Sequence, residues 1–217
     1  MKLKDLYPIT QALLDQLASA CVRIEIAGSL RRGKRDPKDI ELVCIPSIGE
    51  YSVPVYEMFA APAATVHQVN HLEDALMTLI QAGAWEFDPL VRRNGPRYKR
   101  LRHGASGICC DLFITDARRW GVIFAIRTGP ANFSQALVRY ARRQSMFVAD
   151  GLLHQHAPEG YDADGKALPC PAGERCRRIV ETPEEIDVFA ALGLLWIEPA
   201  RRNLNLFYAS RPRASWH

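Results

Sequence analysis

The sequence has no run of about 18 apolar residues, the length that a membrane-spanning helix requires. Its first residues, MKLKDLYPIT, also lack the continuous apolar segment of a secretory signal. We therefore expect neither a membrane partner nor export, and the sequence predicts a cytoplasmic protein. No internal repeat is visible along the chain.

Charged residues are too few to indicate a disordered chain, because they make up 24% of the sequence against 48% hydrophobic residues. A length of 217 residues excludes a large multidomain protein and allows one or two domains. The net charge of +4 is small, so only its distribution is informative. We expect a globular protein that acts as a monomer.

Acidic residues are absent from residues 91–103, a segment rich in basic ones. The basic residues of this segment are Arg92, Arg93, Arg97, Lys99, Arg100 and Arg102. Such a run is either a solvated face or a surface that follows the phosphates of a nucleic acid. The sequence leaves both interpretations open.

The chain contains 6 cysteines, and most of them lie in apolar runs typical of reduced core thiols. Cys170 and Cys176 differ, because they flank a polar loop that follows His154 and His156. These four residues admit a zinc site or a local disulfide. Their spacing matches no established zinc pattern, so the sequence favours neither.

Alternating or apolar segments predict four strands, over residues 22–27, 40–45, 97–102 and 108–114. The last two form a hairpin, with the second strand more buried than the first. A proline-containing connection of about twenty residues is expected between Pro46, which ends the second strand, and the helix that begins at His71. The first half of the chain is therefore expected to combine strands and helices.

Helices are expected over residues 11–20, 71–82, 117–127 and 131–144. A further helix begins at Thr182-Pro183, with the threonine as cap and the proline in the first turn. A second structural unit thus starts near residue 117.

The most informative segment is Gly28-Ser29-Leu30-Arg31-Arg32-Gly33, followed after a short spacer by Asp39-Ile40-Glu41. Residues two apart on a strand project to the same side, so the two acids share a face. A divalent cation with oxygen ligands would remove their repulsion. Two exposed acids on an edge strand are the alternative.

The Gly-Ser turn favours the metal interpretation, because glycine lets backbone amides approach a phosphate closely. The Ser29 hydroxyl can donate to that phosphate, and Arg32 supplies a bidentate guanidinium. Asp111 offers a third acid within an apolar run, where a carboxylate requires a cation or a hydrogen-bonding partner.

These segments resemble the family X DNA polymerases, the group of DNA polymerase beta within the nucleotidyltransferase superfamily. GSLRRG and DIE are similar to the palm signature of that family, and the acid of ICCDLFITD resembles its third metal ligand. RTGPANFSQALVRYARR resembles the Thr-Gly motif, and ETPEEIDVFAALGLLWIEPARR resembles the closing segment. The resemblance covers about residues 22–202.

The resemblance implies an α+β fold in two parts. Residues 1–116 would form the nucleotidyltransferase palm, a mixed sheet with flanking helices that carries the catalytic acids. Residues 117–217 would form a smaller α/β subdomain that selects the nucleotide and ends in a basic tail. This arrangement resembles the small viral members of the family, which consist of these two parts only.

The resemblance also implies a DNA polymerase that adds deoxynucleotides from dNTPs to a DNA 3′ hydroxyl, in short-patch or gap-filling repair. Asp39, Glu41 and Asp111 would be the catalytic metal ligands for two Mg²⁺ ions, with Mn²⁺ able to substitute. The nucleotide-binding residues would be Gly28, Ser29, Arg32, Ile126, Arg127, Thr128, Gly129 and Asn132. Arg97, Lys99 and Arg100 would contact the phosphates of primer-template or gapped DNA.

Among the departures from the family pattern are the second acid and the residues before the Thr-Gly motif. Glu41 stands where these polymerases usually have aspartate, although the wider superfamily accepts either acid. Ile126-Arg127 replaces the usual aromatic pair before Thr-Gly, so we expect weaker discrimination between deoxyribose and ribose. Two alternatives remain: a nucleotidyltransferase for another acceptor (template-independent end addition, RNA, protein or a small molecule), or a non-catalytic module that binds DNA ends.

Overall fold

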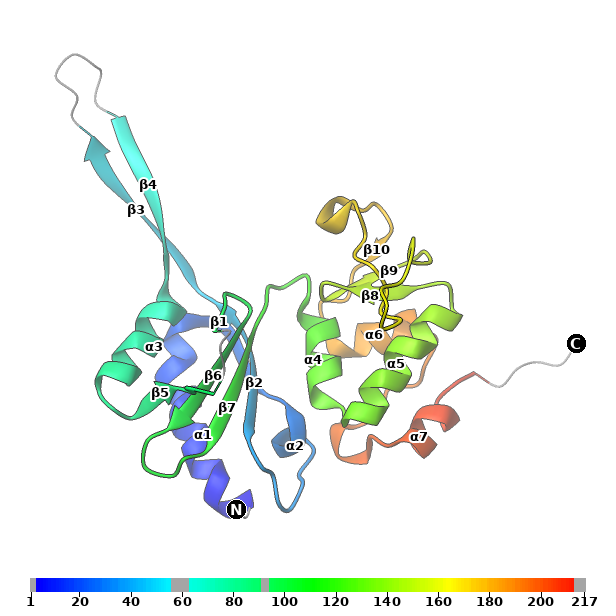
Figure 1. Ribbon diagram of the computed structural model, residues 1–217, viewed down its shortest axis with the longest axis horizontal. Helices are drawn as coiled ribbons and strands as arrows, with labels where there is room; N and C mark the ends of the chain where they lie inside the picture. The colour runs from blue at the N-terminus through cyan, green and yellow to red at the C-terminus, as the bar shows by residue number, and fades with distance from the viewer. Residues whose placement is uncertain (1–2, 56–62, 91–93, 213–217) are drawn as a thin grey trace, which may run out of the picture.

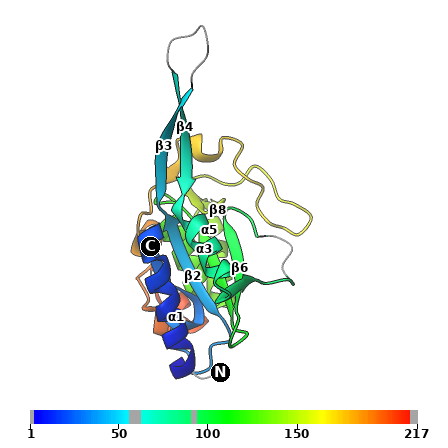
Figure 2. The same ribbon diagram turned by 90° about the vertical axis from the view of Figure 1, so that its left-hand side faces the viewer.

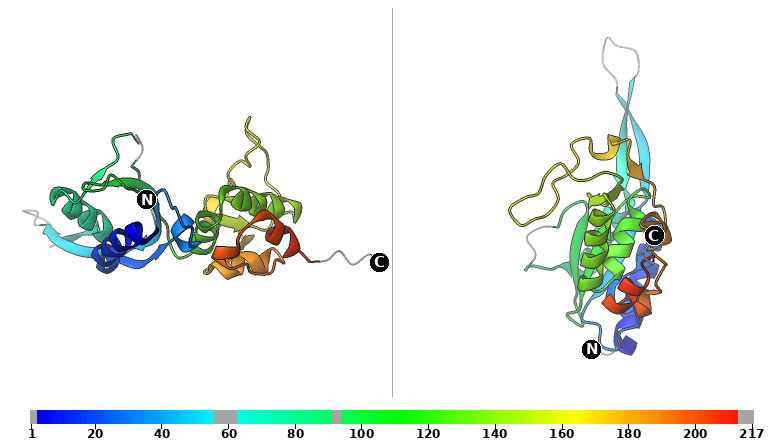
Figure 3. Two further views of the ribbon diagram at one scale, coloured as in Figure 1. Left: turned by 90° about the horizontal axis from the view of Figure 1, so that it is seen from below. Right: turned by 90° about the vertical axis from the view of Figure 1, so that its right-hand side faces the viewer.

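The computed structural model describes residues 3–55, 63–90 and 94–212 of the chain. Two lobes lie side by side in Figure 1, an N-terminal one built around a sheet and a C-terminal one that is mostly helical. The short helix α2 (Gly28–Arg31) lies between them, as Figure 3 also shows from below. In the described part of the chain, no helix is both long and apolar enough to cross a membrane.

The N-terminal sheet has five strands in the order β1-β2-β7-β6-β5. These strands are β1 (Cys21–Ile26), β2 (Ile40–Pro46), β7 (Cys109–Ile114), β6 (Tyr98–His103) and β5 (Trp85–Phe87). The central pair β2 and β7 is parallel, and the other neighbours are antiparallel. The sheet is therefore mixed, as the sequence predicted, and β6 and β7 form the expected hairpin.

The alternation of side chains along β2 shows which face of the sheet forms the core of the N-terminal lobe. Ile40, Leu42 and Cys44 are fully buried and pack, on one face of the sheet, with helices α1 (Leu3–Leu17) and α3 (His71–Gln81). Burying each large aliphatic side chain contributes about 1.5–3 kcal/mol, so this face dominates the stability of the lobe. Helix α1 begins well before the predicted residue 11.

The other face of β2 and β7 is buried against the second lobe. Val43 and Phe113 form a cluster there with Trp120 and Phe124 of helix α4 (Trp120–Thr128). An ion pair of 2.6 Å between Arg23 and Glu184 also joins the lobes. Because both faces of the central strands are covered, the acids at their ends are held by packing on both sides.

After β2, where the sequence predicted only a connection, the chain forms a long hairpin of β3 (Ile48–Val55) and β4 (Ala63–Asn70). The hairpin projects away from the body of the molecule (Figures 1 and 2). Large side chains on it, such as Tyr51 and Val66, are more than half exposed at 52% and 57%. Pro46 and Pro54 interrupt this segment of the sequence, and proline argues against a strand, so the sequence did not indicate a hairpin here.

The C-terminal lobe consists of four helices and a small three-stranded sheet in the order β10-β9-β8. Its elements are α4, α5 (Ala131–Arg143), β8 (Phe147–Ala149), β9 (Leu152–His154), β10 (Ile179–Val180), α6 (Glu185–Ala191) and α7 (Leu204–Ala209). Phe133, Leu137 and Tyr140 form the buried face of α5, as the sequence periodicity predicted. The boundary expected at residues 116 and 117 stays a prediction.

Helix α6 begins later than expected. Glu184, not Thr182, is its cap, and a capping box joins Glu184 to Asp187, whose carboxylate accepts from the Glu184 amide at 2.8 Å. Thr182 is buried, and its carbonyl accepts from the amide of Gly121 at 3.1 Å. Tertiary packing of Thr182 against α4 therefore displaces the helix start from the position that local capping signals favour.

Candidate nucleotidyl-transfer site

Two of the three predicted acids lie directly opposite each other. Glu41 on β2 and Asp111 on β7 are register partners in the parallel pair, and Asp39 immediately precedes β2. Neighbouring strands lie about 4.8 Å apart, and register partners project to the same side, so these carboxylates lie close together on one face of the sheet. The structure thus brings together acids that are far apart in the sequence.

The Gly-Ser turn lies against Glu41. Gly28 has a φ of +57°, and a side-chain carbon added to it would lie 1.6 Å from Glu41 Oε2. The amide of Ala27 donates to the carbonyl of Glu41 at 2.8 Å, which fixes the turn beside β2. Glycine is therefore required at position 28 both by the backbone angle and by the approach of the carboxylate.

Ser29 is buried, and its hydroxyl oxygen has no hydrogen-bond partner among the described residues. A buried polar atom without a partner costs free energy, so such an atom beside a turn points to a missing ligand. An oxyanion at the turn would supply the acceptor that this hydroxyl lacks.

The electrostatics of Glu41 reflect its crowded position. Burial raises the pKa of Glu41 above its ordinary value, and the charges of Asp39 and Asp111 raise it further, while Arg32 opposes them. Ionising Glu41 beside the other two acids is thus unfavourable in the protein alone. An all-oxygen donor set with mutual repulsion suits a divalent cation such as Mg²⁺.

Asp111 already has partners. The Tyr98 hydroxyl donates to Asp111 Oδ1 at 2.6 Å, and Arg100 donates to both carboxylate oxygens at 3.0 and 3.2 Å. Arg100 also donates to Asp88 Oδ2 at 3.0 Å. Burial lowers the pKa of Arg100, but interactions with the side chains of Tyr98 and Cys109 and with the charge of Asp111 outweigh it, so the pKa lies above its ordinary value. Arg100 is therefore a partner of the acid cluster in this structure.

The sequence did not predict this pairing. Arg100 and Asp111 are register partners on antiparallel β6 and β7, so the hairpin register is the signal that could have indicated it. In the described part of the chain, the three acids do not form a compact group of metal-ligating atoms, whereas a set of histidines and cysteines does. The hydrogen bonds from Tyr98 and Arg100 account for the separate orientation of Asp111.

The other basic residues expected to contact DNA have different surroundings. Lys99 is buried, and its Nζ lies 2.9 Å from Glu73 Oε1. Arg97 is 60% exposed and forms an ion pair with Asp150 of the C-terminal lobe. Arg92 and Arg93 lie outside the described residues. Arg97 is thus the one of the three expected DNA contacts whose guanidinium lies mainly in solvent.

The Thr-Gly motif lies at the junction of the lobes. Arg32 donates to the carbonyl of Thr128 at 2.6 Å, and Arg31 donates to the Thr128 hydroxyl at 2.7 Å. A side-chain carbon on Gly129 would lie 2.6 Å from Ser134 Oγ, so this position too is restricted to glycine. The predicted phosphate-binding arginine is therefore tied to the predicted nucleotide-selecting motif.

Ile126 and Arg127 point in different directions. Ile126 packs against the core of the C-terminal lobe. Arg127 lies over the ring of Phe113 at 3.9 Å and lines a cavity of about 760 Å³ together with Tyr98 and Asp111. Asn132 is exposed at the start of α5 and lines a separate hollow. Arg127, rather than Ile126 or Asn132, thus reaches the acid side of the junction.

The wall of this cavity includes a network that sequence reasoning missed. Arg119 is 7% exposed and forms ion pairs with Asp116, Asp150 and Glu174, the second at 3.2 Å. Its Nε donates to the carbonyl of Asp150 at 2.9 Å. Asp150 also binds Arg97, so one aspartate connects the two lobes across the cavity.

Comparisons with known proteins agree with this architecture. Residues 124–203 match the family model described as DNA polymerase beta thumb. A solved structure of Leishmania infantum polymerase beta, described as a ternary P/T complex, has the same fold with a TM-score of 0.66. That similarity has 16% sequence identity and covers 94% of this chain and 76% of the Leishmania chain. No curated protein matches the sequence.

The predicted mixed α+β fold is therefore confirmed. The matched segment lies within residues 117–217, the part predicted to select the nucleotide; that role and the bounds of this part stay predictions. Residues 124–203 match the DNA polymerase beta thumb model, and the fold is similar to that of polymerase beta along almost the whole chain; both findings confirm the resemblance to family X polymerases that the motifs predicted.

Proposed function

We propose that this protein is a nucleotidyltransferase of the polymerase kind, which adds deoxynucleotides from dNTPs to the 3′ hydroxyl of a DNA primer. The observation that carries the proposal is the placement of Gly28 against Glu41, directly across the register from Asp111. The turn can hold phosphates, and the carboxylates can hold cations. The two groups then meet on one face of the sheet. The thumb domain supports the same function.

The turn would bind the triphosphate of the incoming nucleotide. Ser29 would donate its unpartnered hydroxyl to a phosphate oxygen, and Arg32 would offer the guanidinium nitrogens not engaged by Thr128. The primer 3′ oxygen would bond to the α-phosphorus, and the bond to the β-phosphate oxygen would break to release pyrophosphate. Holding the triphosphate still in this way lowers the barrier by orienting the reacting atoms.

Asp39, Glu41 and Asp111 would hold the divalent cations that the fold implies, as Mg²⁺ or Mn²⁺. When bound, such cations lower the pKa of the primer hydroxyl and stabilise charge on the attacking and leaving oxygens. The raised pKa of Glu41 supports this fit, because carboxylates that repel each other gain from a shared cation. Asp111 would join this set by exchanging its hydrogen bonds with Arg100.

Arg97 would contact a DNA phosphate, since its side chain is 60% exposed at the mouth of the cavity between the lobes. Lys99 and Arg100 both form ion pairs within the N-terminal lobe. Lys99 would act by stabilising the fold, and Arg100 by holding the carboxylate of Asp111. The related Leishmania structure is a ternary P/T complex, which supports a primer and template as partners here. Gap filling during repair is the corresponding reaction.

The test is primer extension with a labelled primer that is single-stranded, annealed to a template or placed at a gap. We expect extension that depends on Mg²⁺ or Mn²⁺, and we expect Asp39→Asn and Asp111→Asn to reduce its rate at least about 10³-fold. Asp74→Asn, on the exposed surface of α3, is the matched control and should extend like the wild type.

Near-normal extension by both acid variants would contradict the assignment of these acids. Transfer to RNA or to a protein in place of DNA would keep the nucleotidyltransferase chemistry and overturn the DNA acceptor. DNA binding without any transfer would instead support a non-catalytic module that binds DNA ends.

A further inference from the structure

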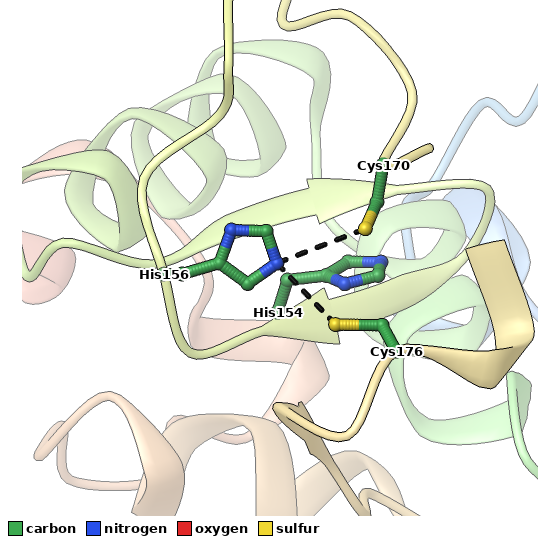
Figure 4. A group of neighbouring side chains, drawn as sticks. All are labelled: His154, His156, Cys170 and Cys176. Carbon is green, nitrogen blue, oxygen red and sulfur yellow. Dashed lines mark hydrogen bonds between the residues drawn. The ribbon is translucent and has the colours of Figure 1, made fainter. Parts of the chain in front are cut away.

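Four side chains with metal-binding atoms converge in the C-terminal lobe, on different residues from the three acids. They are His154, His156, Cys170 and Cys176, and one ligand atom of each lies within 4.8 Å of those of the other three. Figure 4 shows the His156 ring facing both cysteine sulfurs, with the His154 ring beside them. His156 Nε2 lies 3.8 Å from Cys170 Sγ and 3.4 Å from Cys176 Sγ.

The fold brings these residues together from both ends of a long loop. His154 ends strand β9 and pairs with Ile179 of β10, so it belongs to the small sheet. Cys170 and Cys176 flank a single 3₁₀ turn, Gly173–Arg175. Loops of this length with little regular structure are uncommon in compact domains, so an added cross-link would explain how this one is held.

The tautomer of His156 is set for metal binding. Its Nδ1 lies 2.8 Å from the carbonyl of Ala157, and a carbonyl can only accept, so Nδ1 carries the proton. Nε2 is then left with a lone pair that faces both thiols. A carbonyl that orients the far nitrogen of a histidine in this way is the usual second partner of a metal-binding imidazole.

Hydrogen bonding alone leaves this group incompletely satisfied. The Nε2 lone pair of His156 can accept one S–H, yet the sulfurs of both Cys170 and Cys176 point at it. His154 is 1% exposed, and its Nδ1 has no hydrogen-bond partner in the described part of the chain. A cation at the centre of the group would satisfy all four residues.

The packing around His154 fixes the orientation of its ring. The ring stacks on Phe147 with centroids 4.8 Å apart, and this contact fixes its plane. His154 is therefore oriented before any ion binds.

The distances suit one ion in particular. Tetrahedral zinc with Zn–S of about 2.3 Å and Zn–N of about 2.05 Å requires nitrogen and sulfur ligands to lie about 3.6 Å apart. The two nitrogen–sulfur distances at His156 are 3.8 and 3.4 Å, on either side of that value. Two thiolates and two imidazoles also match the preference of zinc over harder cations such as Mg²⁺.

We propose that His154, His156, Cys170 and Cys176 bind one structural Zn²⁺ ion that closes the loop between β9 and β10. Two thiolates neutralise the ion, and four protein ligands fill its tetrahedral shell, which leaves no open position for catalysis. The sequence admitted this site without favouring it, because the spacing of the cysteines is unusual. The structure brings the four side chains together, which is the evidence for a metal site that the sequence alone lacks.

The loop that this ion closes also contacts the wall of the cavity between the lobes. Glu174, in the turn between the two cysteines, forms an ion pair with Arg119, and its carbonyl accepts from Arg118 at 2.8 Å. Arg119 in turn holds Asp150, the partner of Arg97. Zinc would thus fix one end of the network that lines the cavity.

Metal analysis of the purified full-length protein tests the proposal. We expect about one zinc per chain by mass spectrometry of the metals, falling at least about fivefold in Cys170→Ser and in Cys176→Ser. Cys21→Ser, a change of a half-buried cysteine on β1, is the matched control and should keep its zinc. Asp111→Asn should also keep it, which separates this site from the acids.

A second measurement covers the case in which the cysteine variants fail to fold. Removing the metal from the wild type with a chelator should lower the thermal midpoint by at least about 5 °C, and zinc should restore it. Cobalt added to the metal-free protein should give the visible spectrum of a tetrahedral thiolate site.

Two results would overturn the proposal. The first is a wild-type chain that contains no zinc and takes up neither zinc nor cobalt. The second is an intact mass, under non-reducing conditions, that is lighter by the two hydrogens lost in a Cys170–Cys176 disulfide.

Discussion

Arg100 donates from one guanidinium nitrogen to both carboxylate oxygens of Asp111, at 3.0 and 3.2 Å. The same side chain also binds Asp88, which is buried. Arg100 therefore compensates two carboxylates inside the N-terminal lobe. In the proposed catalytic state, a cation would take over the first of these roles.

The first prediction concerns this exchange. Arg100→Ala should lower the free energy of unfolding by about 1–3 kcal/mol, because two carboxylates lose a charged partner in a partly buried site. Urea titrations with and without Mg²⁺ measure the effect. Magnesium should recover part of the loss in this variant and should stabilise the wild type less. Equal responses of the two proteins to Mg²⁺ would show that Arg100 and the cation do not compete.

The second prediction uses two glycines with similar backbone angles. Gly28 and Gly33 have φ values of +57° and +65°, but only at Gly28 would a side-chain carbon collide with Glu41. Gly33→Ala should therefore cost about 1–2 kcal/mol of stability from backbone strain alone. Gly28→Ala should cost more and should also abolish primer extension, because Glu41 must move. Comparable extension rates in the two variants would mean that the contact with Glu41 is unimportant for transfer.

Much of this site was predictable from the sequence, and the reasons are physical. The acids and the Gly-Ser turn occupy positions where strand alternation and turn chemistry are local properties. The partners of Asp111 were not predictable in the same way, because they depend on which residue of β6 lies opposite it. Arg100 therefore looked like a DNA contact in a basic run, although its guanidinium faces two carboxylates.

Other features of the fold were not predictable from the sequence, for the same reason. The start of α6 depends on the packing of Thr182 against Gly121. The two histidines and two cysteines of the proposed zinc site come together only because the loop after β9 folds back to the end of that strand. In each case a long-range contact, not a local pattern, determines the result.

A third prediction follows from the raised pKa of Glu41. A carboxyl group whose pKa is higher in the folded state binds protons more tightly there, so its contribution to stability is lost as pH rises from the unfolded pKa through the folded one. Glu41→Gln should therefore make the protein without metal more stable at neutral pH than the wild type, with a smaller difference at pH 4. The same variant should lose the stabilisation by Mg²⁺ and most primer extension. Denaturant titrations across pH check this; a variant that is less stable at neutral pH would contradict it.

The fourth prediction concerns DNA phosphates. Arg97→Ala should flatten the slope of log affinity against log salt by about one unit, because one phosphate contact is lost. Lys99→Met is a useful comparison, since Lys99 is buried against Glu73 and should affect stability without changing the slope. Fluorescence anisotropy of labelled primer-template across salt concentrations gives both values. An unchanged slope in Arg97→Ala would mean that Arg97 contacts no DNA phosphate and only forms its ion pair with Asp150.

The last prediction concerns the choice between deoxyribose and ribose. The sequence places Ile126 and Arg127 where related polymerases have an aromatic pair, and the structure separates their surroundings. Ile126 packs into the C-terminal core, whereas Arg127 lines the cavity beside Asp111. A long, flexible arginine resists a 2′ hydroxyl less than a ring does, so we expect only about 10–200-fold preference for deoxyribonucleotides. Arg127→Tyr should raise this preference, and Ile126→Val, its control in the core, should leave it within about twofold of the wild type.

Steady-state incorporation of each nucleotide opposite its template partner measures the ratio. A wild-type preference in the thousands that Arg127→Tyr does not change would show that the backbone of the Thr-Gly motif, rather than this side chain, selects the sugar.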